Sequence, residues 1–409
     1  MSPMNTSQLN AVSDPPQDTR RMQLLLCSAV FLLVSGTGII APLLAPYAST
    51  LGISAYAIGF LFSGFYIVRL IIGTPVGFFS EKYGPRNTLI VSLIVYPFVS
   101  LSYFFASDAA SLLGARLLHG VASAMMLPMA MAYMGNISLR GKEGYYIGIL
   151  NTVILSAGAF GPVAGGFIAQ YGGIRAAFSC LFFLSLVSLL VVILLPRENS
   201  LRNDLPGRSA KKEEQVAKPR LNRDILVLAL FNVVIAVFDI FIISFFPLYA
   251  LKMHLSAAAL GVLIAANSLI MAGLQIPFGR LVDRCSRRIC ILVSVAGMSL
   301  SLTLTPLITG VSVWAGLFFF VGATAVSAAL CMAGVSALSV ETGKRDGMGR
   351  IMGFLGSASS FGMVIGPMLN AFLVDRISYE SIFYVTAAMW LLTGVIFMSA
   401  TRGISHDHQ

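Results

Sequence analysis

The stretch TPVGFFSEKYGPR, residues 74–86, returns later in the chain as IPFGRLVDRCSRR, residues 276–288. Proline, glycine, an acid and a final arginine stand at matching places, at a constant offset of 202 residues. Another pair of stretches repeats at an offset of 205, which aligns Gly161-Pro162 with Gly366-Pro367. Self-similarity of this kind indicates an internal duplication. We therefore expect two parallel copies of one structural unit.

The composition predicts that both copies lie in a membrane. Of the 409 residues, 57% are hydrophobic and 11% are charged, whereas about 25% are charged in an average soluble domain. A helix needs about 20 apolar residues to cross ~30 Å of hydrocarbon. The chain has twelve such segments, at residues 22–47, 55–79, 87–106, 110–135, 144–170, 176–195, 225–250, 257–281, 288–307, 311–338, 348–374 and 380–400. The expected fold class is an all-α polytopic membrane protein with twelve transmembrane helices in two parallel six-helix pseudo-repeats.

Polar segments divide the chain around the two halves. Residues 1–21 lack the short apolar core of a secretory signal, so we expect a cytoplasmic N-terminal tail. The segment 196–224 carries prolines and charges of both signs without apolar periodicity. It is expected to be a flexible cytoplasmic linker between the half 22–195 and the half 225–400. Residues 401–409 are expected to form a cytoplasmic tail.

The net charge of +10 would suit a nucleic-acid partner, but the positions of the bases fit a membrane better. If both termini are cytoplasmic, 22 of the 27 Lys and Arg residues lie in cytoplasmic segments. Only Arg175, Lys252 and Arg376 lie in outer loops. The positive-inside rule then favours this orientation. We expect a multi-pass protein of a bacterial-type inner (plasma) membrane that contacts the lipid bilayer and no nucleic acid.

The repeat, the linker and the loop pattern together resemble the major facilitator superfamily, whose loop pattern is G-x-L-a-D-r-x-G-r-k. The matching residues are Gly77, Glu81, Gly84 and Arg86 in the first copy and Gly279, Asp283, Arg284 and Arg288 in the second. The resemblance implies alternating access, with a substrate site between the halves and these residues as a gate. A glycine permits close helix contact, and an acid at a helix end can cap another helix or pair with a base. The alternative is that the bases only hold the loop inside.

The fifth predicted helix contains the residues Gly158, Gly161, Pro162, Gly165 and Gly166. Their pattern, G-x-x-G-P-x-x-G-G, resembles the antiporter signature of the twelve-helix drug:proton antiporter branch. We expect Gly161, Gly165 and Gly166 to form a flat face for close packing. An ordinary small-residue interface is the alternative.

Four ionisable residues are predicted at membrane depth, where a charge is costly and points to function. Asp239 is the expected proton carrier, and either Arg116 or Arg69 is expected to pair with it. By a rise of 1.5 Å per residue, the three lie within ~9 to ~21 Å of the outer surface and are expected to line one cavity. The resemblance assigns Arg116 a role in proton coupling. His119 is either a proton relay or a helix-packing residue, and Asp239 is either a carrier or part of a permanent ion pair.

Aromatic side chains are expected to line the substrate cavity together with Arg69. They are Phe65, Tyr66, Phe238, Phe241 and Phe245. Such a cavity suits amphipathic molecules through apolar area and cation–π contacts. The alternative is that they face lipid. The spare positive charge of Arg69 would suit an anionic substrate group.

No phosphate loop, metal-ligand cluster or nucleophile–base pair is found in the sequence, so no enzyme activity, cofactor or metal is expected. The expected function is a monomeric, proton-coupled secondary transporter, an antiporter that exports small amphipathic compounds. A carrier of an anionic metabolite or siderophore is the first alternative. A sensor or assembly platform with this fold, without solute flux, is the second.

Overall fold

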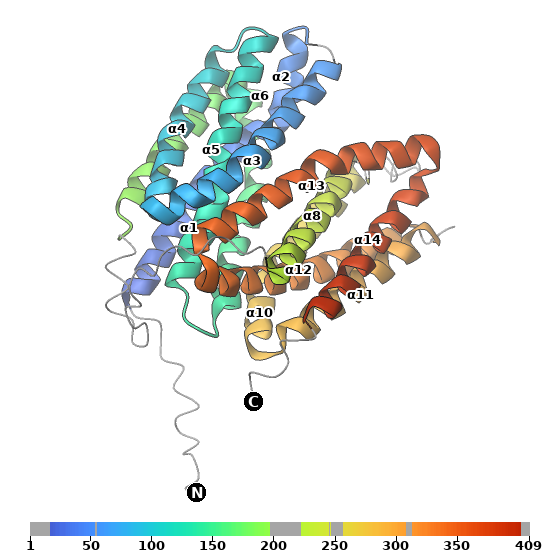
Figure 1. Ribbon diagram of the computed structural model, residues 1–409. Helices are drawn as coiled ribbons and strands as arrows, with labels where there is room; N and C mark the ends of the chain where they lie inside the picture. Colours follow the sequence, from blue (N-terminus) through green and yellow to red (C-terminus); the bar gives the residue numbers. More distant parts are fainter. Residues whose placement is uncertain are drawn as a thin grey trace, which may run out of the picture.

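The computed structural model describes residues 17–53, 55–196, 222–244, 246, 257–307 and 313–401. Within these ranges the chain is almost wholly helical and forms no β-strand (Figure 1). The linker and the two tails expected from the sequence lie mostly outside the described residues. Each of the twelve predicted segments has a helix, which confirms the predicted fold class.

The first half is built from α1 to α6. Its helices are α1 (Gln17–Ile40), η2 (Ala41–Leu43), α2 (Leu44–Thr50), α3 (Ala55–Tyr83), α4 (Pro85–Phe105), α5 (Ala109–Ile137) and α6 (Glu143–Ile193). The second half is built from α8 to α14. Its helices are α8 (Arg223–Ser244), α10 (Ala257–Arg284), α11 (Arg287–Leu304), η3 (Thr305–Leu307), α12 (Val313–Asp346), α13 (Met348–Arg376) and α14 (Tyr379–Thr401).

Ten helices among the described residues are long and apolar enough to cross a membrane. One of them, α6, has 51 residues and contains two predicted segments. At 1.5 Å per residue it would measure about 77 Å if straight, more than twice the hydrocarbon thickness. It turns at Gly173, where φ is 75° and ψ is 171°. Glycine reaches this region without a steric penalty, so the chain reverses there between two spans.

The helix α5 begins at a side-chain cap. The carboxylate of Asp108 accepts a hydrogen bond from the Ser111 N–H at 2.8 Å, and the Ser111 hydroxyl accepts one from the Asp108 N–H. This capping box satisfies two backbone donors that a helix start leaves free. The bond from the Ser111 backbone also lowers the pKa of the Asp108 carboxyl. The boundary between α4 and α5 is therefore set locally.

Each half has its own hydrophobic core. The core of the first half includes Leu89, Tyr133 and Phe178, and that of the second includes Phe231 and Trp390, all fully buried. Between the halves, the extensive contacts are those of α3 with α13 and of α6 with α10. The first core also takes in Val340, Met348 and Met352 of the second half. Two cores joined along a few helices can move as bodies relative to each other.

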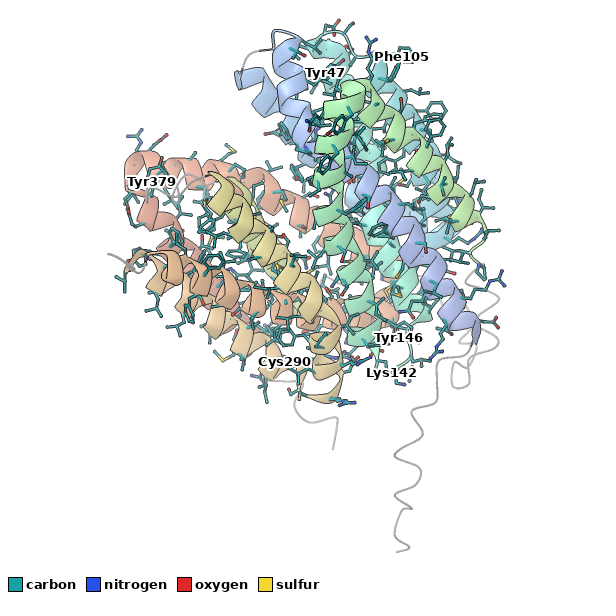
Figure 2. All side chains as sticks on the ribbon, turned by 180° about the vertical axis from the view of Figure 1, so that it is seen from behind. Tyr47, Phe105, Lys142, Tyr146, Cys290 and Tyr379 are labelled. Carbon is teal, nitrogen blue, oxygen red and sulfur yellow. The ribbon has the colours of Figure 1, made fainter. Side chains whose placement is uncertain are left out.

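The halves meet at one end and diverge toward the other (Figure 1). Figure 2 shows Lys142, Tyr146 and Cys290 at the end where they meet. At the other end, Tyr47 and Phe105 lie well apart from Tyr379 (Figure 2). We call these the closed end and the open end.

Candidate substrate cavity and gate

A cavity of about 430 Å³ lies between the halves. Its described lining residues come from eight helices: α3, α5, α6, α8, α10, α12, α13 and α14. Its walls are mostly apolar. Among the described lining residues, Arg69 of α3 and Asp239 of α8 are the charged ones. This central cavity therefore combines an apolar body with one cation and one anion from opposite halves.

A second cavity, of about 250 Å³, lies inside the first half. We call it the N-half cavity. It is lined from α1, η2, α3, α4, α5 and α6. Arg69 and Leu127 line both cavities. Arg69 thus stands at the boundary between them.

Neither charged residue of the central cavity has an ion-pair or hydrogen-bond partner among the described residues. The Nε of Arg69 is buried without a hydrogen bond, and its guanidinium carbon lies 5.6 Å from the Phe65 ring and 5.9 Å from the Tyr66 ring. No ion pair or hydrogen bond of the described structure involves the Asp239 side chain. Among the described residues, Asp239 therefore does not pair with Arg69 or Arg116 as expected. The alternative, a permanent ion pair, is not found there either.

Arg116 and His119 do not share a cavity with Asp239, contrary to expectation. Both line the N-half cavity. The Nε of Arg116 donates to the carbonyl of Leu61 at 3.3 Å, and its guanidinium lies 4.6 Å from the Phe65 ring. The expectation rested on depth along each helix, which does not determine the direction in which a side chain points around the helix axis. The three residues assigned to proton coupling are therefore not one cluster.

His119 is held by aromatic neighbours. Its Nδ1 is hydrogen-bonded to the Tyr103 hydroxyl at 3.1 Å, and its ring packs edge-on against Phe65 and Tyr96. The side chain is 5% exposed. This environment fits the helix-packing reading, while the relay role stays a prediction.

The five predicted aromatic residues divide among different places. Phe238 lines the central cavity, whereas Phe65 and Tyr66 line the N-half cavity. The prediction for Phe241 is wrong, because its side chain is fully buried in the core of the second half, 5.1 Å from the Phe383 ring. The Phe241 ring lies 6.2 Å from that of Phe238, on the side of the core and not of the cavity. Phe245 lies outside the described residues.

Several polar lining residues were missed by sequence reasoning. They are Asn232, Asn267, Ser268, Ser336, Ser339, Ser359 and Trp390. The Nε1 of Trp390 is buried without a hydrogen-bond partner. A polar residue in an apolar helix can face a neighbouring helix equally well, so the sequence carried no signal for their position.

At the closed end α3 packs directly against α13. A Cβ on Gly353 would lie 2.6 Å from the carbonyl oxygen of Gly73 and 2.7 Å from the Cα of Gly77. The carboxylate of Glu81 accepts a hydrogen bond from the Arg350 N–H at 3.1 Å, in the first turn of α13. The acid of the first loop therefore caps a helix of the other half.

The contact of α6 with α10 repeats this arrangement. Gly144 and Gly279 pack against each other so closely that neither has room for a Cβ. The Asp283 carboxylate accepts hydrogen bonds from the N–H groups of Gly144 and Tyr145, both at 2.8 Å. A carboxylate there also meets the positive end of the helix dipole. The duplicated motif thus supplies two similar contacts, each joining the halves.

In the described part of the chain, an ion cluster strengthens the second contact and not the first. Glu143 pairs with Lys344 at 2.8 Å and with Arg287 at 3.0 Å. The Lys344 ammonium also donates to the carbonyl of Ser138 at 3.1 Å. The repeat did not predict this cluster, because the residue aligned with Glu143 at the offset of 205 is Met348. The α12 helix runs eight residues beyond its predicted end, which carries Lys344 to this contact.

The arginines of the loop motif lie elsewhere than the acids. Arg86 donates to the carbonyls of Leu195 and Ile193 at the end of α6, at 2.5 and 2.7 Å. Arg288 donates to the carbonyl of Met398 in α14 at 3.3 Å. Each bond lies within one half, so these arginines tie the last helix of their half to the loop. Gly84 precedes α4 with φ of 85°, and Arg284 is exposed.

The glycines of the antiporter-like motif are not equivalent. A Cβ on Gly161 would lie 2.7 Å from the Cα of Gly38, and one on Gly165 would clash with the carbonyl of Ile39. The space around Gly166 is open, so its predicted place in the packed face is wrong. One residue along a helix turns it by about 100°, away from α1. Gly158 lines the N-half cavity, and Pro162 lies inside the α6 helix.

Comparison with known proteins defines the class. The family model described as Major Facilitator Superfamily matches residues 26–260 and 228–407. The chain therefore belongs to the Major Facilitator Superfamily, whose fold is a multi-pass helical membrane protein.

Individual relatives match over most of their length. An uncharacterized MFS-type transporter of Methanocaldococcus jannaschii is 28% identical over 375 residues, which covers 90% of this chain and 94% of the relative. Multidrug resistance protein 2 of Bacillus subtilis is 24% identical over 379 residues, covering 88% and 90%. The structure of the proton:xylose symporter XylE superimposes with a TM-score of 0.79 at 13% identity, covering 94% and 96%, and shows the shared fold.

Proposed function

We propose that this transporter is a proton-coupled antiporter, which works by alternating access and exports small amphipathic compounds. The observation that carries the proposal is the unpaired Asp239 carboxyl in a mostly apolar cavity between the halves. A buried carboxylate without a partner binds a proton readily. It can bind either a proton or a cationic substrate group, and this exclusivity couples the two fluxes. The name of the Bacillus subtilis relative, a multidrug resistance protein, supports the same function.

The placement of the closed end gives the proposal a direction. Loops 80–86 and 280–288 and the residues near Lys344 carry many bases and lie at this end. By the positive-inside rule it faces the cytoplasm. The structure then represents an outward-facing state, with both termini cytoplasmic in an inner membrane. The contacts of Glu81, Glu143 and Asp283 must break when the cavity opens to the cytoplasm.

A carrier of an anionic metabolite or siderophore is the second candidate, and the unpaired Arg69 favours it. When Asp239 is protonated, Arg69 leaves the cavity with a net positive charge. A purely anionic substrate would therefore bind together with the proton and be carried by symport. The two candidates thus predict opposite responses to a pH gradient.

Proteoliposomes test the proposal. We load them with a fluorescent lipophilic cation or, in a separate assay, supply a labelled organic anion outside, and impose an inward-directed proton gradient in both. The antiporter is expected to export the cation and to dissipate the gradient at the same time. Gradient-driven accumulation of the anion without cation efflux would replace it with the symporter. Absence of flux for every solute would instead favour a sensor or assembly role.

A further inference from the structure

The central cavity presents two opposite charges that do not neutralise each other. Arg69 and Asp239 both line it, yet no ion pair joins them. Among the described lining residues they are the charged or titratable groups, so no other side chain of this lining supplies a counter-charge. An arginine stays protonated at any accessible pH. Within the described part of the chain neither charge has a counter-ion, which leaves both charges to a ligand.

The cation–π contacts of Arg69 do not replace an anion. The Phe65 and Tyr66 rings lie 5.6 and 5.9 Å from its guanidinium carbon, near the ~6 Å limit of such interactions. The guanidinium has five N–H donors arranged to bind a carboxylate through two parallel hydrogen bonds. The Nε of Arg69 is buried, so the two terminal amino groups of the guanidinium are the donors left for a ligand in the central cavity.

We propose, on the basis of the transport function proposed above, that the substrate is an amphipathic zwitterion. Its carboxylate or similar anionic group binds Arg69, and its ammonium group binds Asp239. The apolar body between them packs against lining residues such as Ile235, Phe238, Met271 and Leu355.

A zwitterionic substrate can bind both charged residues and still be exchanged against a proton. Its ammonium competes with a proton for Asp239, so the proton and the substrate exclude each other. Its anionic group stays on Arg69, whose charge does not change. The cavity volume of about 430 Å³ lies within the ~300–1,000 Å³ range of sites for drug-sized ligands.

Binding of matched probes to the full-length protein in detergent tests this inference. The probes are 4′-(aminomethyl)biphenyl-4-carboxylate, which is a zwitterion, 4-biphenylcarboxylate, which is an anion, and 4-(aminomethyl)biphenyl, which is a cation. A one-ring set, based on 3-[4-(aminomethyl)phenyl]propanoate, provides a shorter spacing of the charges. We expect at least one zwitterion to bind about tenfold or more tightly than both of its singly charged analogues. Its affinity is expected to fall as the pH is lowered and Asp239 is protonated.

Two variants separate the two ends of the ligand. Arg69→Gln is expected to abolish the preference for the zwitterion over the cation while keeping the pH dependence. Asp239→Asn is expected to abolish the preference over the anion together with the pH dependence. Arg175→Gln and Asp375→Asn, which alter exposed residues outside the cavity, are the matched controls and should bind as the wild type does.

Probe binding to the wild-type protein tests the inference even if a variant does not fold. Equal binding of the zwitterions and their singly charged analogues, in both sets, would overturn the inference. An increase in the melting temperature of the protein with chloride alone, and no further increase with any zwitterion, would also overturn the inference. Proton-driven export of a simple cation, together with equal probe binding, would contradict the zwitterionic substrate but support the proposed antiport. Preferred binding of a zwitterion without proton-coupled flux would support the zwitterionic ligand but contradict the proposed antiport.

Discussion

The carboxylate of Glu143 and the ammonium of Lys344 lie 2.8 Å apart across the contact between the two halves. Their side chains are 6% and 14% exposed, so the pair is largely shielded from solvent. Glu143 begins α6, and Lys344 lies near the end of α12. Because the two residues belong to different halves, the pair exists only while the closed end stays closed. It therefore contributes to the balance between the two conformations.

Glu143→Gln is expected to shift the protein toward a state in which the closed end is open. The substitution leaves Lys344 and Arg287 as neighbouring cations without their shared anion, and breaking a buried pair is costly. We expect the closed-to-open ratio to fall by about tenfold or more, which is about 1.4 kcal/mol. The distance between spin labels at Phe105 and Ile377 is measured by electron paramagnetic resonance in a cysteine-free background. It is expected to become shorter in the variant.

Glu341→Gln is the control for this variant. Glu341 also pairs with Arg287, at 2.5 Å, but its side chain is 60% exposed. An exposed pair contributes about 0–1 kcal/mol, so the distance distribution should hardly change. Equal effects of the two variants would show that Glu143 has no special role at the closed end.

Asp283→Asn is expected to weaken the closed end more than Glu81→Gln. Asp283 accepts two backbone hydrogen bonds at 2.8 Å, whereas the described bond of Glu81 is a single one at 3.1 Å. A hydrogen bond to a charged group contributes about 1.5–3 kcal/mol. The same spin labels should show a larger shift for Asp283→Asn. The reverse order would mean that the α3–α13 contact dominates the gate.

Gly165→Ala and Gly166→Ala are expected to differ although the residues are adjacent. A methyl group at 165 would clash with the backbone of Ile39, whereas at 166 it meets open space. Overpacking of this kind costs about 1–3 kcal/mol, so Gly165→Ala should lower the melting temperature of the purified protein. Gly166→Ala should leave it unchanged or raise it slightly, because alanine favours a helix by about 1 kcal/mol. A stable Gly165→Ala variant would contradict the close α1–α6 contact.

Asp239→Asn is expected to abolish proton-coupled transport without unfolding the protein. Asparagine has nearly the same shape but binds no proton, so exchange against a gradient should stop. Proteoliposomes that export substrate at several pH values measure the effect, with Asp375→Asn as the matched control. Unchanged pH dependence of flux in Asp239→Asn would remove Asp239 from the coupling mechanism.

The helical segments and the duplication could be predicted from the sequence, because both are local or periodic properties. Gly173, for example, falls between the predicted segments 144–170 and 176–195 and divides α6 there. The loop acids Glu81 and Asp283 were also singled out correctly as candidates for capping another helix. Their partners, Arg350, Gly144 and Tyr145, could not be found in this way, since they are backbone groups of the other half.

What only the tertiary structure decided is the direction in which each side chain points. The sequence determined that Arg69, Arg116 and Asp239 lie within apolar segments long enough to cross a membrane, because length and composition are local properties. It did not determine that Arg116 lines one cavity, Asp239 another and Arg69 both. A helix that is apolar on every side has no polar face to reveal its orientation. That orientation is fixed by packing against helices distant in the sequence, and with it the charges that a substrate meets.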